Sequence, residues 1–583
     1  MDDPLNTLIS IEGTAKRAPP IFTQKTECQD CYKCIRECPV KAIQVKEGDA
    51  SILPELCILC GHCVDACPRG AKQVRDDIPR AAALLQGPHE TWVSLAPSFL
   101  TEFPGVRPGQ LIAALRLLGF ARVSETAIGA ELVSHHVAER LARGGDALLI
   151  SSACPTAVEY LRKYAAPHAV FLTELLSPLL AHARLLRQNA TGPIALVFIG
   201  PCIAKKIEAD QHPELVDVAL TFEDLHRWLA HRGIRPASLE EGPDDAFSPR
   251  RSRDGALYPV EGGMIRSIQG QRAGLEAQFL SVSGIARFAE ALAGLDATTE
   301  GRLFLELLAC PGGCVNGPKS HARVSTVCKH LALARYARAA LPVTERAPIE
   351  ETYSPSALSR RLVTEEKLRE VLRLVGKEGP EDELNCGGCG YESCRDFALA
   401  YLDGKAERTM CVAHLRALAQ KKADVLLRKL PSALALLDRD LRVVECNPHF
   451  NQLFAGPKEA DGANLEGRNL GDLTPFTELF ENFLRSGEET LEKDLRFQGR
   501  ILHTLLFQIE KHDLFGALFE DITRPATQRE QIIRRSRQVI QQNLKTVQEI
   551  ASLIGENAAD SEIILSSIVD SFQDGERAGG DHG

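Results

Sequence analysis

The chain has 583 residues, of which 44% are hydrophobic and 25% are charged, and its formal net charge is −10 at pH 7. This composition is typical of soluble globular protein and fits about four domains, while the negative charge gives no electrostatic reason to expect a nucleic acid or an anionic membrane as a partner. The longest apolar runs, such as 194–199, have the length of strands, not of membrane spans. The first residues lack the basic and apolar regions of a signal peptide, so we expect a cytoplasmic protein.

The 18 cysteines are the most informative feature of the composition, because they are clustered. In a reducing cytosol, clustered cysteines indicate metal or redox chemistry more often than disulfides. Their distribution and the changes in pattern along the chain predict an α/β multidomain protein. Its predicted parts are a leader (1–21), a cysteine-dense module (22–78), an α/β domain (79–345), a proline-containing linker (346–364), a small helical cysteine-bearing domain (365–425), an α+β domain (426–525) and a helical segment (526–583).

The first cysteine block repeats one pattern, Cys-x2-Cys-x2-Cys-x3-Cys-Pro. This spacing is that of bacterial ferredoxins, in which three thiolates hold one [4Fe-4S] cluster and the fourth ligates the other cluster. We therefore expect a ferredoxin-like module that binds two [4Fe-4S] clusters. The predicted ligands are Cys28, Cys31, Cys34 and Cys67 for the first cluster, and Cys57, Cys60, Cys63 and Cys38 for the second. A pair of structural zinc sites is the alternative.

Apolar runs at 147–150, 195–199 and 303–308 are each followed closely by a turn, which predicts parallel strands alternating with helices. A cysteine lies in the turn after each run, and the third turn holds two, at Cys310 and Cys314. Four cysteines that converge from strand ends could hold one cubane. From the residues alone, unrelated buried cysteines remain the alternative.

The segments 151–155, 200–208 and 306–317 resemble, in order, the three signature segments of [FeFe]-hydrogenases, and the likeness covers residues 22–345. The resemblance implies an H-cluster, that is, a [4Fe-4S] cubane joined to a two-iron centre with CO, cyanide and a dithiolate. Its implied cubane ligands are Cys154, Cys202, Cys310 and Cys314, with Cys314 as the bridge. Lys205 matches the lysine that hydrogen-bonds a cyanide, and Ala96 and Pro97 match the pair whose backbone lines the dithiolate.

The sequence departs from that family at several positions. Ala153 replaces a cysteine that passes protons to the two-iron centre, and a methyl group cannot relay protons. Gly200 replaces a methionine, Pro318 interrupts the third segment, and His135 and His136 lie where an acidic pair is usual. We therefore expect slow turnover; this altered pattern is similar to the sensory branches of the family.

A further cysteine set, Cys386, Cys389, Cys394 and Cys411, lies in a glycine-rich loop and beyond a predicted helix at 395–402. It resembles the [4Fe-4S] domain of the Rnf complex B subunit and of the corrinoid subunit of acetyl-CoA synthesis. A zinc site is the alternative. The two remaining cysteines, Cys328 and Cys446, are expected to be packed core residues.

Residues 426–525 resemble a PAS domain, through the segments 434–438 and 443–448, a predicted helix at 449–454 and the ending 519–523. A plain dimerisation module is the alternative. The helical segment beyond carries an apolar stripe that would dimerise or dock a partner. Since no kinase-like histidine or nucleotide loop is recognised, signalling would require another protein.

These features together predict a protein with three [4Fe-4S] clusters and an H-cluster that reacts slowly with H2 and acts as a hydrogen or redox sensor. Its expected partners are H2 and protons, a redox partner such as ferredoxin, a downstream signalling protein and a second copy of the chain, with neither nucleic acid nor membrane. An ordinary ferredoxin-linked hydrogenase and a non-enzymatic cluster protein without the two-iron centre are the alternatives.

Overall fold

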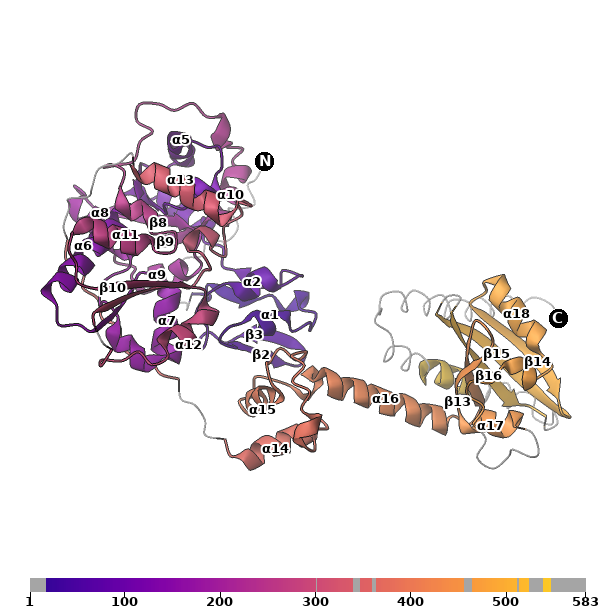
Figure 1. The fold of residues 1–583 in the computed structure, drawn as a ribbon. Helices are drawn as coiled ribbons and strands as arrows, with labels where there is room; N and C mark the ends of the chain where they lie inside the picture. Colours follow the sequence, from indigo (N-terminus) through magenta and orange to yellow (C-terminus); the bar gives the residue numbers. More distant parts are fainter. Residues whose placement is uncertain are drawn as a thin grey trace. The chain divides into compact units, whose positions relative to one another are not determined.

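The computed structural model describes residues 17–299, 301–338, 347–358, 363–455, 464–510, 513–523 and 538–546. The chain divides into two compact units, Met1–Met410 and Cys411–Gly583, and Figure 1 shows the elements of each. Within the described ranges, no helix has both the length and the apolar character that crossing a bilayer requires. Residues 538–546 are helical, and the rest of the predicted helical segment from 526 lies outside the described residues.

The N-terminal module contains two antiparallel strand pairs and two short helices. Each helix follows a residue in the left-handed region, Tyr32 (φ 54°) or Gly61 (φ 84°), where the cysteine loop turns into the helix. Residues 17–21 belong to this fold, not to a separate leader, because Arg75 donates to the carbonyl of Ala18 at 2.8 Å and the first strand begins at Ile21. The elements are β1 (Ile21–Thr23) paired with β4 (Lys72–Val74), β2 (Ile43–Lys46) paired with β3 (Asp49–Ile52), α1 (Lys33–Glu37) and α2 (His62–Ala66).

The α/β domain holds two separate parallel sheets. The first has the order β6 (Arg122–Glu125), β5 (Glu90–Leu95), β8 (Ile194–Gly200), β9 (Val218–Thr221), and the second the order β10 (Gln278–Ser283), β11 (Leu303–Leu308), β7 (Leu148–Ile150). Every residue of β7, β8 and β11 is buried, as expected of parallel strands covered on both faces. The prediction of parallel strands alternating with helices is confirmed.

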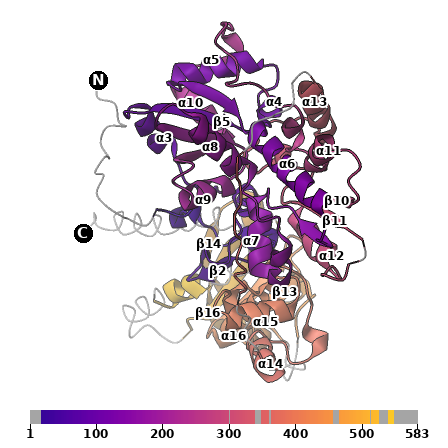
Figure 2. The same cartoon turned by 90° about the vertical axis from the view of Figure 1, so that its left-hand side faces the viewer.

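Helices cover these sheets (Figure 2). Helix α6 (Ala127–Arg143) packs against α8 (Pro178–Asn189) and α11 (Gly263–Gln271), and α3 (Ile78–Leu85) packs against β5 and β9. The remaining helices of the domain are α4 (Phe99–Glu102), α5 (Pro108–Leu118), α7 (Pro155–Tyr164), α9 (Ala204–Gln211), α10 (Phe222–His231), α12 (Phe288–Leu292) and α13 (Thr326–Arg338).

The first half of the predicted linker is part of the α/β domain. Ile349 is fully buried in the core, and its carbonyl accepts a hydrogen bond from the amide of Leu176. Glu350 bridges to Leu175, whose carbonyl also accepts the hydroxyl of Tyr353 at 2.9 Å. We call residues 347–356 the strap. The predicted linker boundary at 346 was wrong because this stretch is packed against the core of the domain and hydrogen-bonded to it.

The small cysteine domain (residues 365–410 of the first unit) contains α14 (Glu365–Leu374) and α15 (Cys394–Leu402). Leu368, Val371 and Leu372 of α14 pack on Ala398 of α15 and form its apolar core. Helix α15 begins at the expected position because the side chain of Ser393 caps it, accepting the amide of Asp396.

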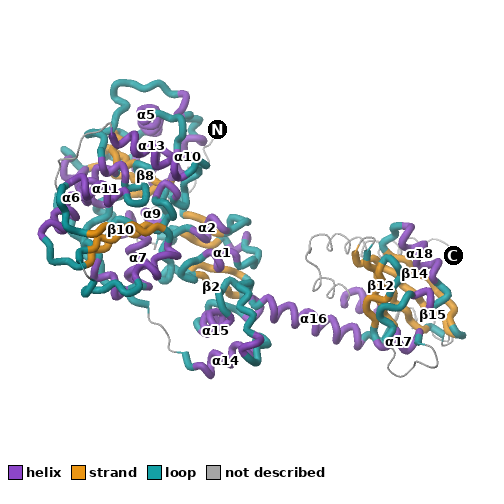
Figure 3. Tube along the Cα trace, viewed as in Figure 1, coloured by secondary structure: helices purple, strands orange, loops and turns teal. Residues whose placement is uncertain are grey.

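The second unit begins with α16 (Val412–Lys429) and contains one five-stranded antiparallel sheet (Figure 3). Phenylalanines dominate its core, including Phe450, Phe480, Phe515 and Phe519. The strands, in sheet order, are β13 (Val443–Cys446), β12 (Ala433–Asp438), β16 (Leu514–Asp521), β15 (Arg500–Glu510) and β14 (Thr490–Phe497), accompanied by α17 (Pro448–Phe454) and α18 (Thr477–Ser486).

Candidate functional site

The carboxyl ends of both parallel sheets open onto one cavity of about 110 Å³. Ligands of open α/β sheets bind beyond the carboxyl ends of the strands, and the residues predicted from the signature segments lie there. Strand β7 leads to Cys154, β8 to Cys202, and β11 to Cys310 and Cys314. All four cysteines line the cavity, together with Ala96 and Pro97 after β5, and with Lys205 and Ala153.

The four thiols lie close enough to influence one another. The pKa of Cys202 is raised to about 11, first by burial and then by the neighbouring Cys154. Burial, then the other cysteines, also raises the pKa of Cys310 and of Cys314. Buried thiols of this kind lose their protons on metal binding, because the metal replaces the proton as the positive partner. The structure thus brings the predicted set together, and its role as ligands remains a prediction.

Glycine is required at one turn of this site. Gly313 has φ +102°, and a Cβ there would lie 2.3 Å from the carbonyl oxygen of Pro259. Any other residue would push the turn away from Pro259 and displace Cys314, the predicted bridging ligand.

Lys205 is held at the cavity by two polar partners. Its ammonium donates to the hydroxyl of Ser177 at 3.0 Å and to Glu208 at 2.5 Å, and the residue is 8% exposed. An ammonium carries three N–H donors. Two are used here, so one remains for an acceptor in the cavity.

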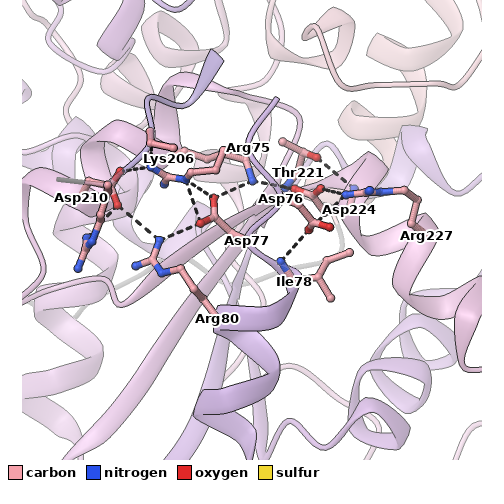
Figure 4. Close-up of polar contacts among 12 residues, drawn as sticks. Arg75, Asp76, Asp77, Ile78, Arg80, Lys206, Asp210, Thr221, Asp224 and Arg227 are labelled. Atoms are coloured by element: carbon pink, nitrogen blue, oxygen red, sulfur yellow. Dashed lines mark hydrogen bonds and ion pairs between the residues drawn. The ribbon is translucent and has the colours of Figure 1, made fainter. Parts of the chain in front are cut away.

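A buried ion-pair network fixes the helix that carries Lys205 (Figure 4). The adjacent Lys206 has a side chain with no exposed surface, and it lies 3.0 Å from Asp77 and 2.9 Å from Asp224. Burial alone would raise the pKa of Asp77, but the Lys206 ammonium and the Arg75 guanidinium hold it below its usual range. The network therefore ties the end of the N-terminal module to α9 and α10, and so orients Lys205.

Ser98 is a cavity residue that sequence reasoning missed. It lines the cavity directly after Ala96 and Pro97 and is 2% exposed, yet its buried hydroxyl has no hydrogen-bond partner among the described residues. A buried unpaired hydroxyl is unfavourable. This orphan donor and the spare N–H of Lys205 suit a group with acceptor atoms, such as cyanide ligands, and so the residues present fit the implied cofactor.

The structure shows where the residues that differ from the family pattern lie relative to the cavity. Ala153 lines the cavity beside Cys154, so no titratable group stands there. His135 pairs with Glu139 at 3.2 Å and His136 contacts the carbonyl of Ala347 at 3.0 Å; neither histidine lines the cavity.

Two further departures are explained by packing. A Cβ at Gly200 would lie 2.5 Å from the ring of Phe198, so the close approach of that ring requires glycine. Pro318 packs against the module's second cysteine loop, because a Cβ at Gly61 would lie 2.6 Å from it.

The cysteines of the N-terminal module fall into the two sets that the spacing predicts. The pKa of Cys34 is raised to about 11 by burial, and Cys28, Cys31 and Cys67 lie near enough to contribute. Burial likewise raises the pKa of Cys63, with further contributions first from Cys60, Cys57 and Cys38. Backbone amides point at the sulfurs, as in the bond from Ala42 to Cys38 at 3.3 Å. The ligand roles themselves remain a prediction.

The second set lies beside the cavity. Lys163 and Tyr164 at the end of α7 donate to the carbonyls of Cys57 and Leu56, at 2.8 Å and 2.6 Å. Cys60 lies near enough to Cys310 to raise the pKa of that buried thiol.

Cys386 and Cys389 lie in one loop of the small cysteine domain and Cys394 begins α15, where its amide donates to the side chain of Asn385 at 2.8 Å. Cys411 caps α16 in the second unit, and its assignment rests on the sequence spacing. Among the described residues, no three His, Cys, Asp or Glu side chains surround a single metal-ion position.

Two cysteines lie outside all of these sets. The prediction that Cys328 is a core residue was wrong, since it is exposed on α13. Cys446 is half-buried, and its thiol donates to Asn451 at 3.1 Å.

Comparison with known families assigns three parts of the chain. Residues 89–318 match the model of the iron only hydrogenase large subunit, C-terminal domain, residues 27–72 match the 4Fe-4S dicluster domain, and residues 382–413 match a model described as "Putative Fe-S cluster". Among curated relatives, the chain is 26% identical over 357 residues to the periplasmic [Fe] hydrogenase large subunit of Nitratidesulfovibrio vulgaris, covering 50% of this chain and 84% of the relative. It is also 26% identical over 391 residues to the NADP-reducing hydrogenase subunit HndD of Solidesulfovibrio fructosivorans, covering 53% of this chain but 66% of the relative, just under two thirds.

Solved structures show two likenesses. An [FeFe]-hydrogenase studied for oxygen inactivation of its H cluster aligns at 20% identity with a TM-score of 0.38, over 48% of this chain and 91% of that one. A PAS domain of an HTR-like protein from Haloarcula marismortui aligns at 19% identity with a TM-score of 0.15, over 18% of this chain and 93% of that one. The two family models in the first unit, together with the hydrogenase relatives, show that residues 27–72 and 89–318 of this chain are similar to the iron–sulfur and C-terminal domains of [FeFe]-hydrogenases.

Proposed function

We propose that this protein holds an H-cluster at the cavity and three [4Fe-4S] clusters at its other cysteine sets, reacts slowly with H2 (H2 ⇌ 2 H+ + 2 e−), and serves as a hydrogen or redox sensor. The observation that carries the proposal is the convergence of Cys154, Cys202, Cys310 and Cys314 on one cavity that also contains Lys205. The clustered thiols suit the reducing cytoplasm, where they stay available for metal.

The residues of the chain have distinct parts in this proposal. Bound at the cavity, the two-iron centre would supply the redox chemistry of hydrogen. Cys314 would bridge it to the cubane, Lys205 would hold an anionic ligand by a charge-assisted hydrogen bond, and Ala96 and Pro97 would line the dithiolate. Because the side chain of Ala153 has no titratable group, proton delivery would be the slow step.

The sensor part of the proposal is supported by the second unit. Its antiparallel sheet, with the helix α17 after β13 and the final strand β16, supports the proposal of a PAS-like domain. A PAS-like domain without enzymatic residues of its own would pass a signal to another protein, so we propose a downstream signalling partner, an electron carrier such as ferredoxin, and homodimer formation.

An infrared spectrum of the anaerobically purified, maturated full chain, recorded under argon and then under H2, tests the proposal. We expect sharp CO and cyanide bands that shift under H2, and we expect a Cys314→Ser variant to lose them. Total iron per chain serves as the internal control. If the bands are absent while all cubanes are loaded, the chain is a non-enzymatic cluster protein. A high specific activity would instead identify an ordinary ferredoxin-linked hydrogenase.

A further inference from the structure

The small cysteine domain is joined to the N-terminal module by hydrogen bonds between residues about 350 positions apart. Lys41 donates to the carbonyl of Gly390 at 3.0 Å, and Gln44 donates to that of Gly404 at 2.7 Å. The amide of Val45, on β2, donates to the carbonyl of Lys405 at 2.9 Å. The small domain therefore continues the hydrogen bonding of a strand edge that would otherwise be open.

The contact places the cysteine loops of the two domains together. Arg36 donates to the carbonyl of Cys31, in the first cysteine set, at 3.1 Å and to the carbonyl of Gly388, between Cys386 and Cys389, at 3.2 Å. One guanidinium thus clamps both loops. Gly390, with φ +92°, packs so closely that a Cβ there would lie 2.8 Å from the side chain of Ile35.

Tyr391 carries a buried hydroxyl without a partner at this interface. The residue is 3% exposed, and among the described residues no hydrogen-bond partner is found for its hydroxyl oxygen. Burial raises the pKa of Tyr391, and the thiols of Cys389 and Cys38 raise it further, so the hydroxyl lies within the field of a cysteine from each domain. A buried hydroxyl is normally hydrogen-bonded, and the acceptors that the surrounding cysteines would bring are cluster sulfurs.

We infer that the small cysteine domain and the N-terminal module form one electron-transfer unit, clamped by Arg36 and Lys41, in which the Tyr391 hydroxyl donates to a cluster sulfur at their interface. A [4Fe-4S] cluster held by each domain would supply one-electron transfer across this interface, from the reduced cluster to the oxidised one, with no bond made and no proton moved. The inference rests on the proposed binding of a cluster by the small domain.

The docking is tested without reference to any cluster by hydrogen exchange of residues 43–47 in the full chain. An Arg36→Gln/Lys41→Gln variant should exchange faster than wild type in this peptide, because the amides of Val45 and Glu47 lose their partners Lys405 and Glu407. Lys33→Gln, an exposed lysine on the same helix α1, is the matched control and should exchange as wild type does. Equal exchange in all three proteins would overturn the docked arrangement.

Electron transfer is tested by electron paramagnetic resonance of the anaerobically reduced chain. We expect magnetic broadening of the module's cluster signals that disappears in Cys394→Ser, with a matching fall in iron content. If iron falls but the broadening stays, the small domain's cluster is isolated and the inference is wrong. If the iron content does not fall, the small domain holds no cluster, and the proposed function fails at that cluster together with the inference.

The role of the hydroxyl is tested by a redox titration of Tyr391→Phe. A hydrogen bond to a cluster sulfur stabilises the extra negative charge of the reduced state, so its loss should lower the midpoint potential of one cluster at unchanged iron content. Tyr401→Phe, a partly buried tyrosine of the same domain, is the control. A Tyr391→Phe titration that matches wild type would show that the hydroxyl has no part in the interface.

Discussion

Replacing Lys206 with methionine should destabilise the first unit strongly, although Lys206 does not line the cavity. Its side chain has no exposed surface, and Asp77 and Asp224, 3.0 Å and 2.9 Å away, are 1% and 4% exposed. Removing one partner of a buried ion pair costs about 3–5 kcal/mol, because the remaining charge is uncompensated. Asp77 keeps Arg75 and Arg80 and Asp224 keeps Arg227, so we expect the lower end, about 3 kcal/mol.

Thermal unfolding of the full chain, followed by circular dichroism under argon, measures this effect. For domains of 150–250 residues, 1 kcal/mol corresponds to about 2–4 °C, so the apparent Tm should fall by about 6 °C or more. Arg80→Met is the matched control, since Arg80 contacts the same Asp77 but its side chain is 34% exposed; such a pair contributes about 1 kcal/mol or less. Equal shifts for Lys206→Met and Arg80→Met would refute the reasoning that burial makes this network strong.

Three other substitutions test the site and its surroundings. Burial raises the pKa of Glu125 from 4.5 to about 7, so the stability that the protonated carboxyl contributes is full below about pH 4.5 and declines as the pH rises to about 7. The decline of the apparent Tm with pH should become shallower in Glu125→Gln, although Glu306, whose pKa is also raised by burial, keeps part of that decline. An unchanged slope would contradict the assignment. Ser98→Ala should stabilise the cofactor-free protein by about 1 kcal/mol in chemical unfolding, and it should shift the infrared bands of the loaded protein. Destabilisation of the cofactor-free form would show that the Ser98 hydroxyl has a hydrogen-bond partner there. Ala153→Cys should raise H2 oxidation by up to about 100-fold in a dye-reduction assay, and a wild-type rate would mean that other parts of the proton path are missing too.

The sequence predicted the parts of this molecule that depend on local spacing. The doubled cysteine pattern and the strand-then-cysteine segments led to the groups that the structure brings together, because short spacings and parallel strand ends leave little freedom in where a thiol lies. Ser98 was missed although it directly follows Ala96 and Pro97, and the signal was available in the printed sequence: a hydroxyl residue in the turn after a buried strand.

Other features were out of reach because they depend on contacts between distant segments. No local feature of the sequence distinguishes a free linker from the strap at 347–356. The strap is held by its backbone hydrogen bonds to residues 174–176. The exposure of Cys328 depends on which face α13 turns to the core. The clamp by Arg36 joins positions 352 residues apart, and neither partner shows an unusual pattern by itself.

The strap is hydrogen-bonded to the candidate site through one backbone carbonyl. The carbonyl of Leu175 accepts the hydroxyl of Tyr353 on the strap at 2.9 Å and also the hydroxyl of Ser152 at 2.7 Å. Ser152 lies two residues before Cys154, so a ligand loop and the segment that leaves the domain are anchored at the same atom. A shift of the loop that carries Ser152 would therefore act on the strap through the Leu175 carbonyl, two residues from the predicted ligand Cys154.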